Sequence, residues 1–204
     1  MRFYDSVGPN PHVVRMVMAE KGLAIETVTL DILKGENRQA AHVARNPAGG
    51  TPALETDDGA VICEITAIAE YLEELHPEPP LIGRTAAERA EARMWMRRID
   101  LYILEPMANG FRATEGRPLF APRMTLVTPE AGAELKAIAA EKLLWLDGLM
   151  AGRTWVCGER FTLADILLFA FVQFGATVRQ PIPTGASWLP GWRERVAARP
   201  SAGA

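Results

Sequence analysis

The stretch Pro77-Glu78-Pro79-Pro80 separates two parts of the sequence that have different patterns. Proline removes a backbone donor and fixes φ, so this stretch cannot continue a helix and favours extended backbone. Before it, β-branched runs alternate with helical periodicity, whereas no strand signal follows it. The 204 residues are therefore expected to form two domains, residues 1–76 and 85–204, joined by a linker at 77–84.

The first part has the pattern of a small mixed sheet with helices on its faces. The Gly8-Pro9-Asn10-Pro11 cluster ends the first strand, and Asp57-Asp58-Gly59 is a hairpin signal between two short apolar runs. The expected order is βαβαββα. Strands are expected at 2–5, 25–30, 52–56 and 60–63, and helices at 13–22, 37–44 (weaker or irregular) and 64–75.

The second part contains helical signals only. Its composition predicts two long helices, from Thr85 to about residue 112 and over 129–150. A third, very apolar helix is expected over 161–174, where Thr162 and Asp165 have the spacing of a capping box, and a last short helix over 188–199. The Ala/Gly tail after Pro200 is expected to fray. The fold class is thus a mixed α+β domain followed by an all-α helical bundle.

Composition excludes several classes of protein. A formal charge of −3 supplies no basic field for nucleic acid or anionic lipid, so neither is an expected partner. Cys63 and Cys157 lack CxxC or Cys/His spacing, which argues against a disulfide framework, a zinc site or any other metal site. The sequence has no signal-peptide pattern and no apolar run long enough to span a bilayer, so the expected compartment is the cytoplasm.

Two segments carry a resemblance to a known family. Residues 46–54, NPAGGTPAL, and 63–72, CEITAIAEYL, resemble the N-P-x-G-x-[VT]-P-x-L segment and the E-[ST]-x-A-I-x-x-Y-L helix start of cytosolic glutathione transferases. The resemblance covers nearly the whole chain, because the long-helix part and its capping box also look like that family's second domain. It implies a thioredoxin-like N-terminal domain that binds glutathione and a helical domain that contributes the second-substrate pocket.

The physical chemistry of the first segment fits a peptide ligand. Thr51 precedes Pro52 and must be extended, and the resemblance implies a cis bond, which turns the Thr51 backbone outward to pair with glutathione like an added strand. Glu64 at the helix start can meet the γ-glutamyl amino group, while the free amides of Ile65 and Thr66 meet its carboxylate. The alternative is structural: Pro52 begins an edge strand and Glu64 caps a helix electrostatically.

Ile65 departs from the family pattern, which has Ser or Thr at this position. The hydroxyl contact to the ligand carboxylate is lost, although the backbone amide remains and Thr66 offers a neighbouring hydroxyl. The expected loss is about one hydrogen bond, roughly 0.5–1.5 kcal/mol. Binding is weakened but not abolished.

The loop from Asp5 to Pro11 is expected to stabilise the glutathione thiolate. A free thiol titrates at about 8.5, so the anion needs a hydrogen-bond donor and the positive end of a helix. By resemblance the usual Ser or Cys position falls on Gly8, and Gly8-Pro9-Asn10 is similar to the Thr-Pro-Asn segment of the nu class. The candidate catalytic residues, in order of preference, are Asn10, Ser6 and Tyr4. Each also has a structural interpretation: a cap or turn residue, a loop residue and a core aromatic.

The resemblance places further residues around the ligands. Lys34 and Arg38 are candidates for the glycyl carboxylate of glutathione. The candidate second-substrate pocket consists of Tyr102, Met107, Phe111 and Arg112, although such a Met and aromatic stripe is more often plain core.

The leading hypothesis is a glutathione S-transferase that conjugates reduced glutathione, its co-substrate, to an electrophilic small molecule. Such a protein supplies a lowered thiol pKa and proximity. The family implies a homodimer, in which Asp100 acts from the partner subunit. One alternative is a non-catalytic glutathione-binding protein, which Gly8 and Ile65 favour. Another is a glutathione-dependent isomerase, dehalogenase or peroxidase, since the same thiolate serves each reaction.

Overall fold

The computed structural model describes all residues, Met1–Ala204, and divides the chain into two compact units. The first contains Met1–Ile82 together with Arg199–Ala204, and the second contains Gly83–Ala198. The domain boundaries predicted from the sequence were 1–76, 77–84 (linker) and 85–204. They differ from these units at the linker and in the last six residues. As boundaries of functional domains they remain a proposal. None of the helices combines the length and apolarity needed to cross a membrane.

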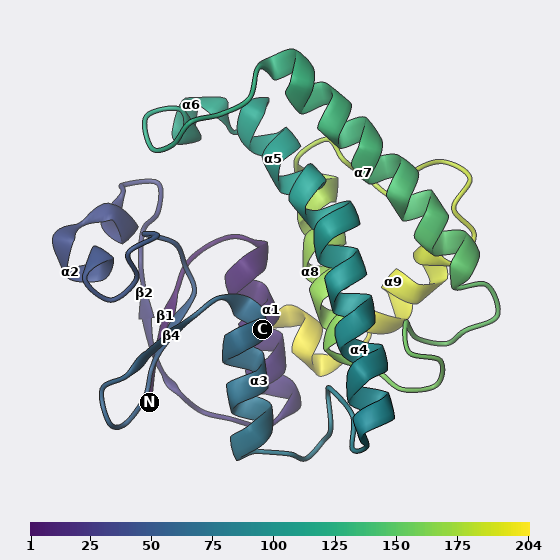
Figure 1. The fold of residues 1–204 in the computed structure, drawn as a ribbon, viewed down its shortest axis with the longest axis horizontal. Coiled ribbons are helices and arrows are strands. Elements are labelled where there is room, and N and C mark those ends of the chain that lie inside the picture. Colours follow the sequence, from purple (N-terminus) through teal and green to yellow (C-terminus); the bar gives the residue numbers. More distant parts are fainter. The chain divides into compact units, whose positions relative to one another are not determined.

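The first unit is built on a four-stranded mixed sheet of order β2-β1-β3-β4. β1 is parallel to β2 and antiparallel to β3, and β4 is antiparallel to β3. In Figure 1, α1 and α3 lie on one side of the sheet and α2 lies on the other. The elements are β1 (Arg2–Asp5), α1 (Pro9–Glu20), β2 (Glu26–Thr29), η1 (Glu36–Arg38), α2 (Ala40–Val43), β3 (Ala53–Glu55), β4 (Val61–Cys63) and α3 (Ile65–Leu75).

This order confirms the expected βαβαββα arrangement, and the core of the unit lies between the sheet and α1 with α3. Phe3 and Leu54 pair across β1 and β3 and are fully buried, as are Val14 and Leu72 on the two helices. The middle helix is the weakest element, as expected. It consists of a 3₁₀ turn, η1, and a single α-helical turn, α2.

The C-terminal tail does not fray, contrary to the sequence-based expectation. Residues Pro200–Gly203 form a 3₁₀ turn, η3, that packs on α1. The carboxylate of Glu20 accepts two hydrogen bonds of 2.7 Å from Arg199 and one of 2.5 Å from the Ser201 hydroxyl. Composition suggested fraying because it carries no information about this distant carboxylate.

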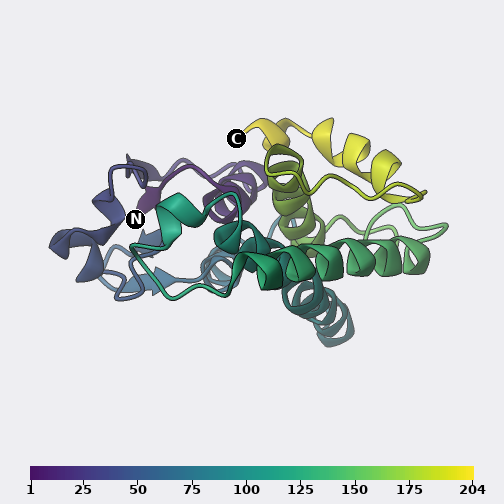
Figure 2. The same ribbon diagram turned by 90° about the horizontal axis from the view of Figure 1, so that it is seen from above.

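The second unit is entirely helical, as expected. α5 packs on α7 and α4 packs on α8, and Figure 2 shows α7 lengthwise. The elements are α4 (Ala86–Ile99), η2 (Asp100–Leu104), α5 (Glu105–Ala113), α6 (Arg117–Phe120), α7 (Pro129–Leu149), α8 (Leu163–Thr177) and α9 (Leu189–Ala197).

The first long helix of this unit is interrupted by a π-helical turn, η2, over Asp100–Leu104. Pro106 follows this turn. A proline inside a helix cannot donate to the carbonyl four residues earlier, here that of Tyr102, and its ring clashes there. A π turn widens the helix at such a point. The expected single helix over 85–112 is therefore three consecutive helical segments.

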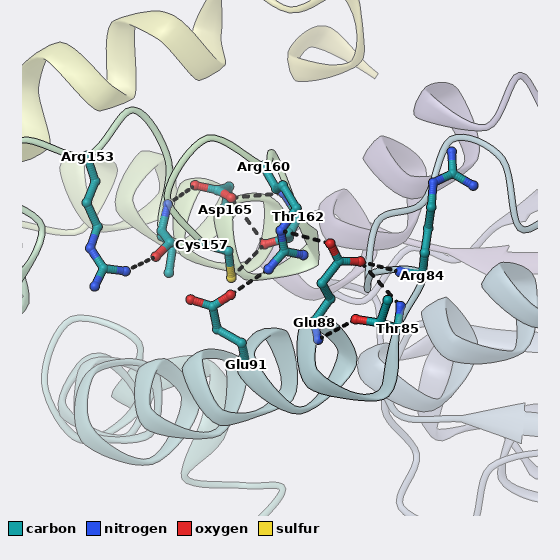
Figure 3. Close-up of polar contacts among 10 residues, drawn as sticks. Arg84, Thr85, Glu88, Glu91, Arg153, Cys157, Arg160, Thr162 and Asp165 are labelled. Atoms are coloured by element: carbon teal, nitrogen blue, oxygen red, sulfur yellow. Dashed lines mark hydrogen bonds and ion pairs between the residues drawn. The ribbon is translucent and has the colours of Figure 1, made fainter.

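The predicted capping box of the apolar helix α8 is confirmed. The Asp165 carboxylate accepts hydrogen bonds of 2.9 Å from the N–H groups of Thr162 and Val156. Figure 3 shows these contacts beside a second group, in which Arg160 donates to Glu91 of α4 at 2.5 Å. The loop before α8 is thereby attached to both helices.

Candidate active site

The loop that leads into β3 is folded by its own side chains. The Thr51-Pro52 bond is cis, as the resemblance implied. Asn46 accepts from the Ala48 N–H at 3.1 Å through Oδ1 and donates to the Gly50 carbonyl at 3.0 Å through Nδ2. The N–H and C=O of Thr51 make no hydrogen bond within the chain. The loop thus presents a short unpaired backbone edge at Thr51.

Glu64 occupies the position that the sequence assigned to it, directly before α3. Its side chain is exposed and makes no capping hydrogen bond, so any stabilisation of α3 by this carboxylate is electrostatic. Its φ of 71° lies in the left-handed region, which costs a non-glycine residue on the order of 1–3 kcal/mol and recurs at functional sites. The N–H groups of Ile65 and Thr66 belong to the first turn of α3, where the helix itself supplies no acceptor. A carboxylate and free amides therefore lie together.

Ser6 is in the site, but its proton is already used. Its side chain is buried, with only 2 % of the residue exposed. The Ser6 Oγ lies 2.5 Å from the Thr51 hydroxyl and 3.2 Å from the Val7 carbonyl. Since a hydroxyl has one proton, Ser6 can serve only one acceptor at a time. The contact with Thr51 links the loop after β1 to the loop before β3.

Tyr4 is not brought to the loop after β1. Its hydroxyl donates to the Glu55 carboxylate at 2.6 Å, and the Arg45 guanidinium lies 4.7 Å from the ring centroid. The hydrogen bond from Tyr4 holds the pKa of Glu55 below its ordinary value. Tyr4 is thus a buried sheet residue, in keeping with the core alternative.

Asn10 is the third candidate, and unlike the Ser6 and Tyr4 hydroxyls its side chain is not engaged within the chain. It is the second residue of α1, and its neighbours Pro9 and Pro11 carry no N–H. The free donors of the first turn are thereby concentrated in Asn10, whose carboxamide has no hydrogen-bond partner in the chain. Gly8 before it has a φ of 120°, which L side chains rarely adopt. A Ser or Cys at this position would be strained in this backbone conformation.

The two cations proposed for the glycyl carboxylate have different surroundings. Lys34 is exposed and forms an ion pair of 3.1 Å with Asp31. Arg38 is also exposed, but it lies along Gly49 and donates to the Ala48 carbonyl at 3.3 Å. Arg38 therefore belongs to the loop, whereas no contact ties Lys34 to it.

The four candidate second-substrate residues do not line one cavity of the second unit. Met107 is fully buried and borders a cavity of about 350 Å³ between α5, α7 and residues 179–184. Tyr102 is exposed and meets Trp145 edge-on at 5.8 Å. Phe111 and Arg112 instead contact Phe120. The Phe111 and Phe120 ring centroids are 5.9 Å apart, and the Arg112 guanidinium carbon lies 5.8 Å from the Phe120 centroid.

Neither cysteine has the surroundings of a nucleophile. Burial raises the pKa of the Cys157 thiol to about 11, and burial with the nearby Glu64 carboxylate raises that of Cys63. A thiol of raised pKa carries little thiolate at neutral pH.

His42, in α2, is buried, with 3 % of the residue exposed. Its Nε2 lies 2.7 Å from the Gly50 carbonyl. Asn37 is similarly buried and donates to the Gly49 carbonyl at 2.6 Å. Nothing in the sequence identifies these contacts, because they depend on how η1 and α2 fold back over the loop.

Comparison with known proteins identifies the family. The N-terminal domain of glutathione S-transferases matches residues 7–75, and the C-terminal domain of the same family matches residues 118–200. Glutathione S-transferase 2 of Saccharomyces cerevisiae is 33% identical over 205 residues, which cover 98% of this chain and 87% of the relative.

Two further proteins are similar to most of this chain. The crystal structure of a glutathione S-transferase domain-containing protein from Marinobacter aquaeolei superposes with a TM-score of 0.92 at 36% identity, over 99% of this chain and 100% of that one. The maleylacetoacetate isomerase of Pseudomonas aeruginosa is 40% identical over 181 residues, 81% of this chain and 78% of the isomerase. With its βαβαββα unit, its helical unit and its loop before a cis proline, this chain belongs to the glutathione S-transferase family.

Proposed function

We propose that this glutathione transferase binds reduced glutathione along Thr51, Pro52 and the start of α3, and conjugates it to electrophilic small molecules. The observation that carries the proposal is that a negatively charged acceptor and free hydrogen-bond donors lie together at the start of one helix. The exposed Glu64 carboxylate lies beside the free N–H groups of Ile65 and Thr66. An α-amino acid end, with its ammonium and carboxylate, is complementary to this combination.

The remainder of glutathione is assigned to the neighbouring loop. The unpaired N–H and C=O of Thr51 suit the cysteinyl residue of the peptide, as in strand addition. Arg38, which lies along the same loop, is the better placed of the two cations for the glycyl carboxylate, and exposed Lys34 is a secondary candidate.

We assign thiolate stabilisation to Asn10. Its N–H and its unpartnered carboxamide both lie at the positive end of α1, whereas the hydroxyls of Ser6 and Tyr4 are engaged by Thr51 and Glu55. Glutathione supplies the nucleophilic sulfur. A new carbon–sulfur bond then forms as the leaving group of the electrophile departs with the bonding electrons, and the protein contributes thiolate stabilisation and orientation.

The electrophile pocket and the assembly complete the proposal. Tyr102, Met107, Phe111 and Arg112 remain candidates for the second-substrate pocket by resemblance. A homodimer is proposed because large apolar side chains are exposed on η2 and α7, among them Leu101, Leu144 and Trp145. Asp100 at the start of η2 is the candidate contribution to the partner's site, and the cytoplasm is the proposed compartment.

A second candidate activity is glutathione-dependent isomerisation. It is favoured by the similarity to the isomerase of Pseudomonas aeruginosa. The same thiolate would add to a double bond and leave again after rotation, so the site described above serves both reactions. A panel of halogenated aromatics, epoxides and cis-unsaturated diketo acids separates the two, because conjugation consumes glutathione and isomerisation does not.

Glutathione titration of four proteins tests the binding site: wild type, Glu64→Gln, Asn10→Ala and, as a matched control, Glu141→Gln on the exposed face of α7. Loss of a charged hydrogen bond of about 1.5–3 kcal/mol is expected to weaken Glu64→Gln roughly tenfold or more. Asn10→Ala is expected to keep binding but to lose the ultraviolet signal of bound thiolate. The control should match wild type. Absence of wild-type binding at millimolar glutathione would refute the proposed function.

A further inference from the structure

The carbonyl of Gly50 is held by two buried donors from the segment that folds over the loop. His42 Nε2 approaches it at 2.7 Å and Asn46 Nδ2 at 3.0 Å. Both residues are almost completely buried. A carbonyl oxygen has two lone pairs, so both donors can be accommodated at once. The two side chains form a clamp on one backbone oxygen, here called the Gly50 clamp.

The tautomer of His42 follows from this contact. Since the Gly50 oxygen can only accept, Nε2 must carry the proton, and Nδ1 is then an acceptor. Nδ1 is buried and has no hydrogen-bond partner. A buried polar atom without a partner costs free energy, so burial alone would favour an apolar residue here. The ring nitrogen that does have a partner is Nε2, which faces the loop.

The clamp fixes the direction of the next backbone donor. The Gly50–Thr51 peptide is not among the cis bonds of the chain, and in a planar trans peptide the C=O and N–H point in opposite directions. With its oxygen drawn toward His42 and Asn46, this peptide directs the Thr51 N–H away from them. That N–H has no partner in the chain.

We propose that His42 is a positioning residue for substrate binding: with Asn46, it orients the Gly50–Thr51 peptide so that the Thr51 N–H meets the cysteinyl carbonyl of glutathione. This inference rests on the proposed function. His42 does not touch the substrate. It acts through the loop, and it preorganises a donor that would otherwise lose rotational freedom on binding.

Two substitutions at His42 separate the donor from the bulk of the ring. In His42→Gln the amide nitrogen can occupy the place of Nε2 and donate to Gly50, whereas His42→Leu fills space without a donor. Asn37→Ala is the matched comparison, because it removes a buried hydrogen bond to the neighbouring Gly49 carbonyl at 2.6 Å and leaves the Gly50 clamp intact.

The measurements are KM for glutathione, KM for the electrophile, kcat and the thermal midpoint of each variant. His42→Leu is expected to raise KM for glutathione on the order of fivefold, the equivalent of one hydrogen bond, with kcat and KM for the electrophile within twofold of wild type. His42→Gln should restore KM to within twofold. Asn37→Ala should lower the thermal midpoint as much as His42→Leu while changing KM for glutathione less.

Several results would overturn the inference. If wild type binds glutathione and His42→Leu has an unchanged KM, the clamp has no role in binding, although the proposed function stands. Equal defects in His42→Leu and His42→Gln would show that the ring shape matters and the donor does not. An equal defect in Asn37→Ala would reduce the effect to loop stability. If wild type does not bind glutathione at all, the proposed function fails and this inference fails with it.

Discussion

Lys21 lies at the centre of a buried ion pair that ties the linker region to the first unit. Its side chain is 0% exposed, and that of its partner Glu73 is 2% exposed. The three ammonium protons have three acceptors: Glu73 Oε2 at 2.6 Å and the carbonyls of His76 and Pro79 at 2.7 and 3.0 Å. The ammonium group is therefore fully satisfied.

The Glu73 carboxylate is held by further donors on the other side. It accepts from the N–H groups of Leu81 and Ile82 at 3.1 and 2.9 Å. Lys21→Met would keep most of the side-chain length but leave this carboxylate buried with two backbone donors and no counter-charge. Breaking a buried pair in this way costs about 3–5 kcal/mol, a large fraction of the roughly 5–15 kcal/mol by which a domain is stable.

Lys142→Met is the matched control. Lys142 pairs with Glu141 at 2.8 Å, but the two side chains are 37% and 71% exposed. An exposed pair contributes at most about 1 kcal/mol. The same chemical change should therefore have a much smaller effect there.

Hydrogen exchange across a urea series, read by mass spectrometry on peptides from α1 and α3, measures the effect. Tryptophan fluorescence gives an internal reference, because all five tryptophans of the chain lie in the second unit. We expect a loss of about 3–5 kcal/mol in the first unit for Lys21→Met. A loss below about 1 kcal/mol, or one equal to that of Lys142→Met, would refute the argument from burial.

Three further predictions concern the second unit. Asp147→Ala should cost at least about 2 kcal/mol in fluorescence-detected unfolding, because this buried carboxylate accepts from the Trp188 and Leu189 N–H groups at 2.9 and 2.7 Å; a loss under half that size would contradict it. Burial raises the pKa of Asp165 from 3.8 to about 6, so its contribution to stability is largest below pH 4 and is lost as pH rises through 6. The stability of wild type relative to Asp165→Asn should therefore be about 2 kcal/mol greater at pH 4 than at pH 7, and a flat difference would count against the raised pKa. Gly110→Ala places a Cβ 2.5 Å from Lys136 Cγ and 3.0 Å from the Gly132 carbonyl oxygen. Urea unfolding should show a net loss, since two such close contacts belong at the upper end of the overpacking cost of about 1–3 kcal/mol, above the gain of about 1 kcal/mol in helix propensity.

Much of the fold could be predicted from the sequence because its signals are local. Glycines, prolines and the Asp58-Gly59 dipeptide mark the turns of the first unit, and the capping box at Thr162 and Asp165 marks the start of α8. The π turn before Pro106 was not foreseen, because a helical pattern with one proline is compatible with a kink, an end or a wider turn.

The residues of the candidate site also fall into two groups, those that the sequence indicates and those that depend on the structure. Thr51, Pro52 and Glu64 are candidates from the sequence alone because their proposed roles depend on backbone geometry that short motifs specify. The proposed preference for Asn10 over Ser6 and Tyr4 rests on the structure. The hydroxyls of Ser6 and Tyr4 contact Thr51 and Glu55, which lie 45 and 51 residues away in sequence.

The sequence by itself determined the two-part architecture, the order of elements, and the family motif before β3 and α3. Only the tertiary structure decided which polar side chains are satisfied within the protein and which are left without a partner in the chain. Buried polar groups must find partners, and those partners often come from distant segments, as with Lys21 and Glu73 or Tyr4 and Glu55. Periodicity and motifs describe neighbours along the chain, whereas this pairing is set by packing in space.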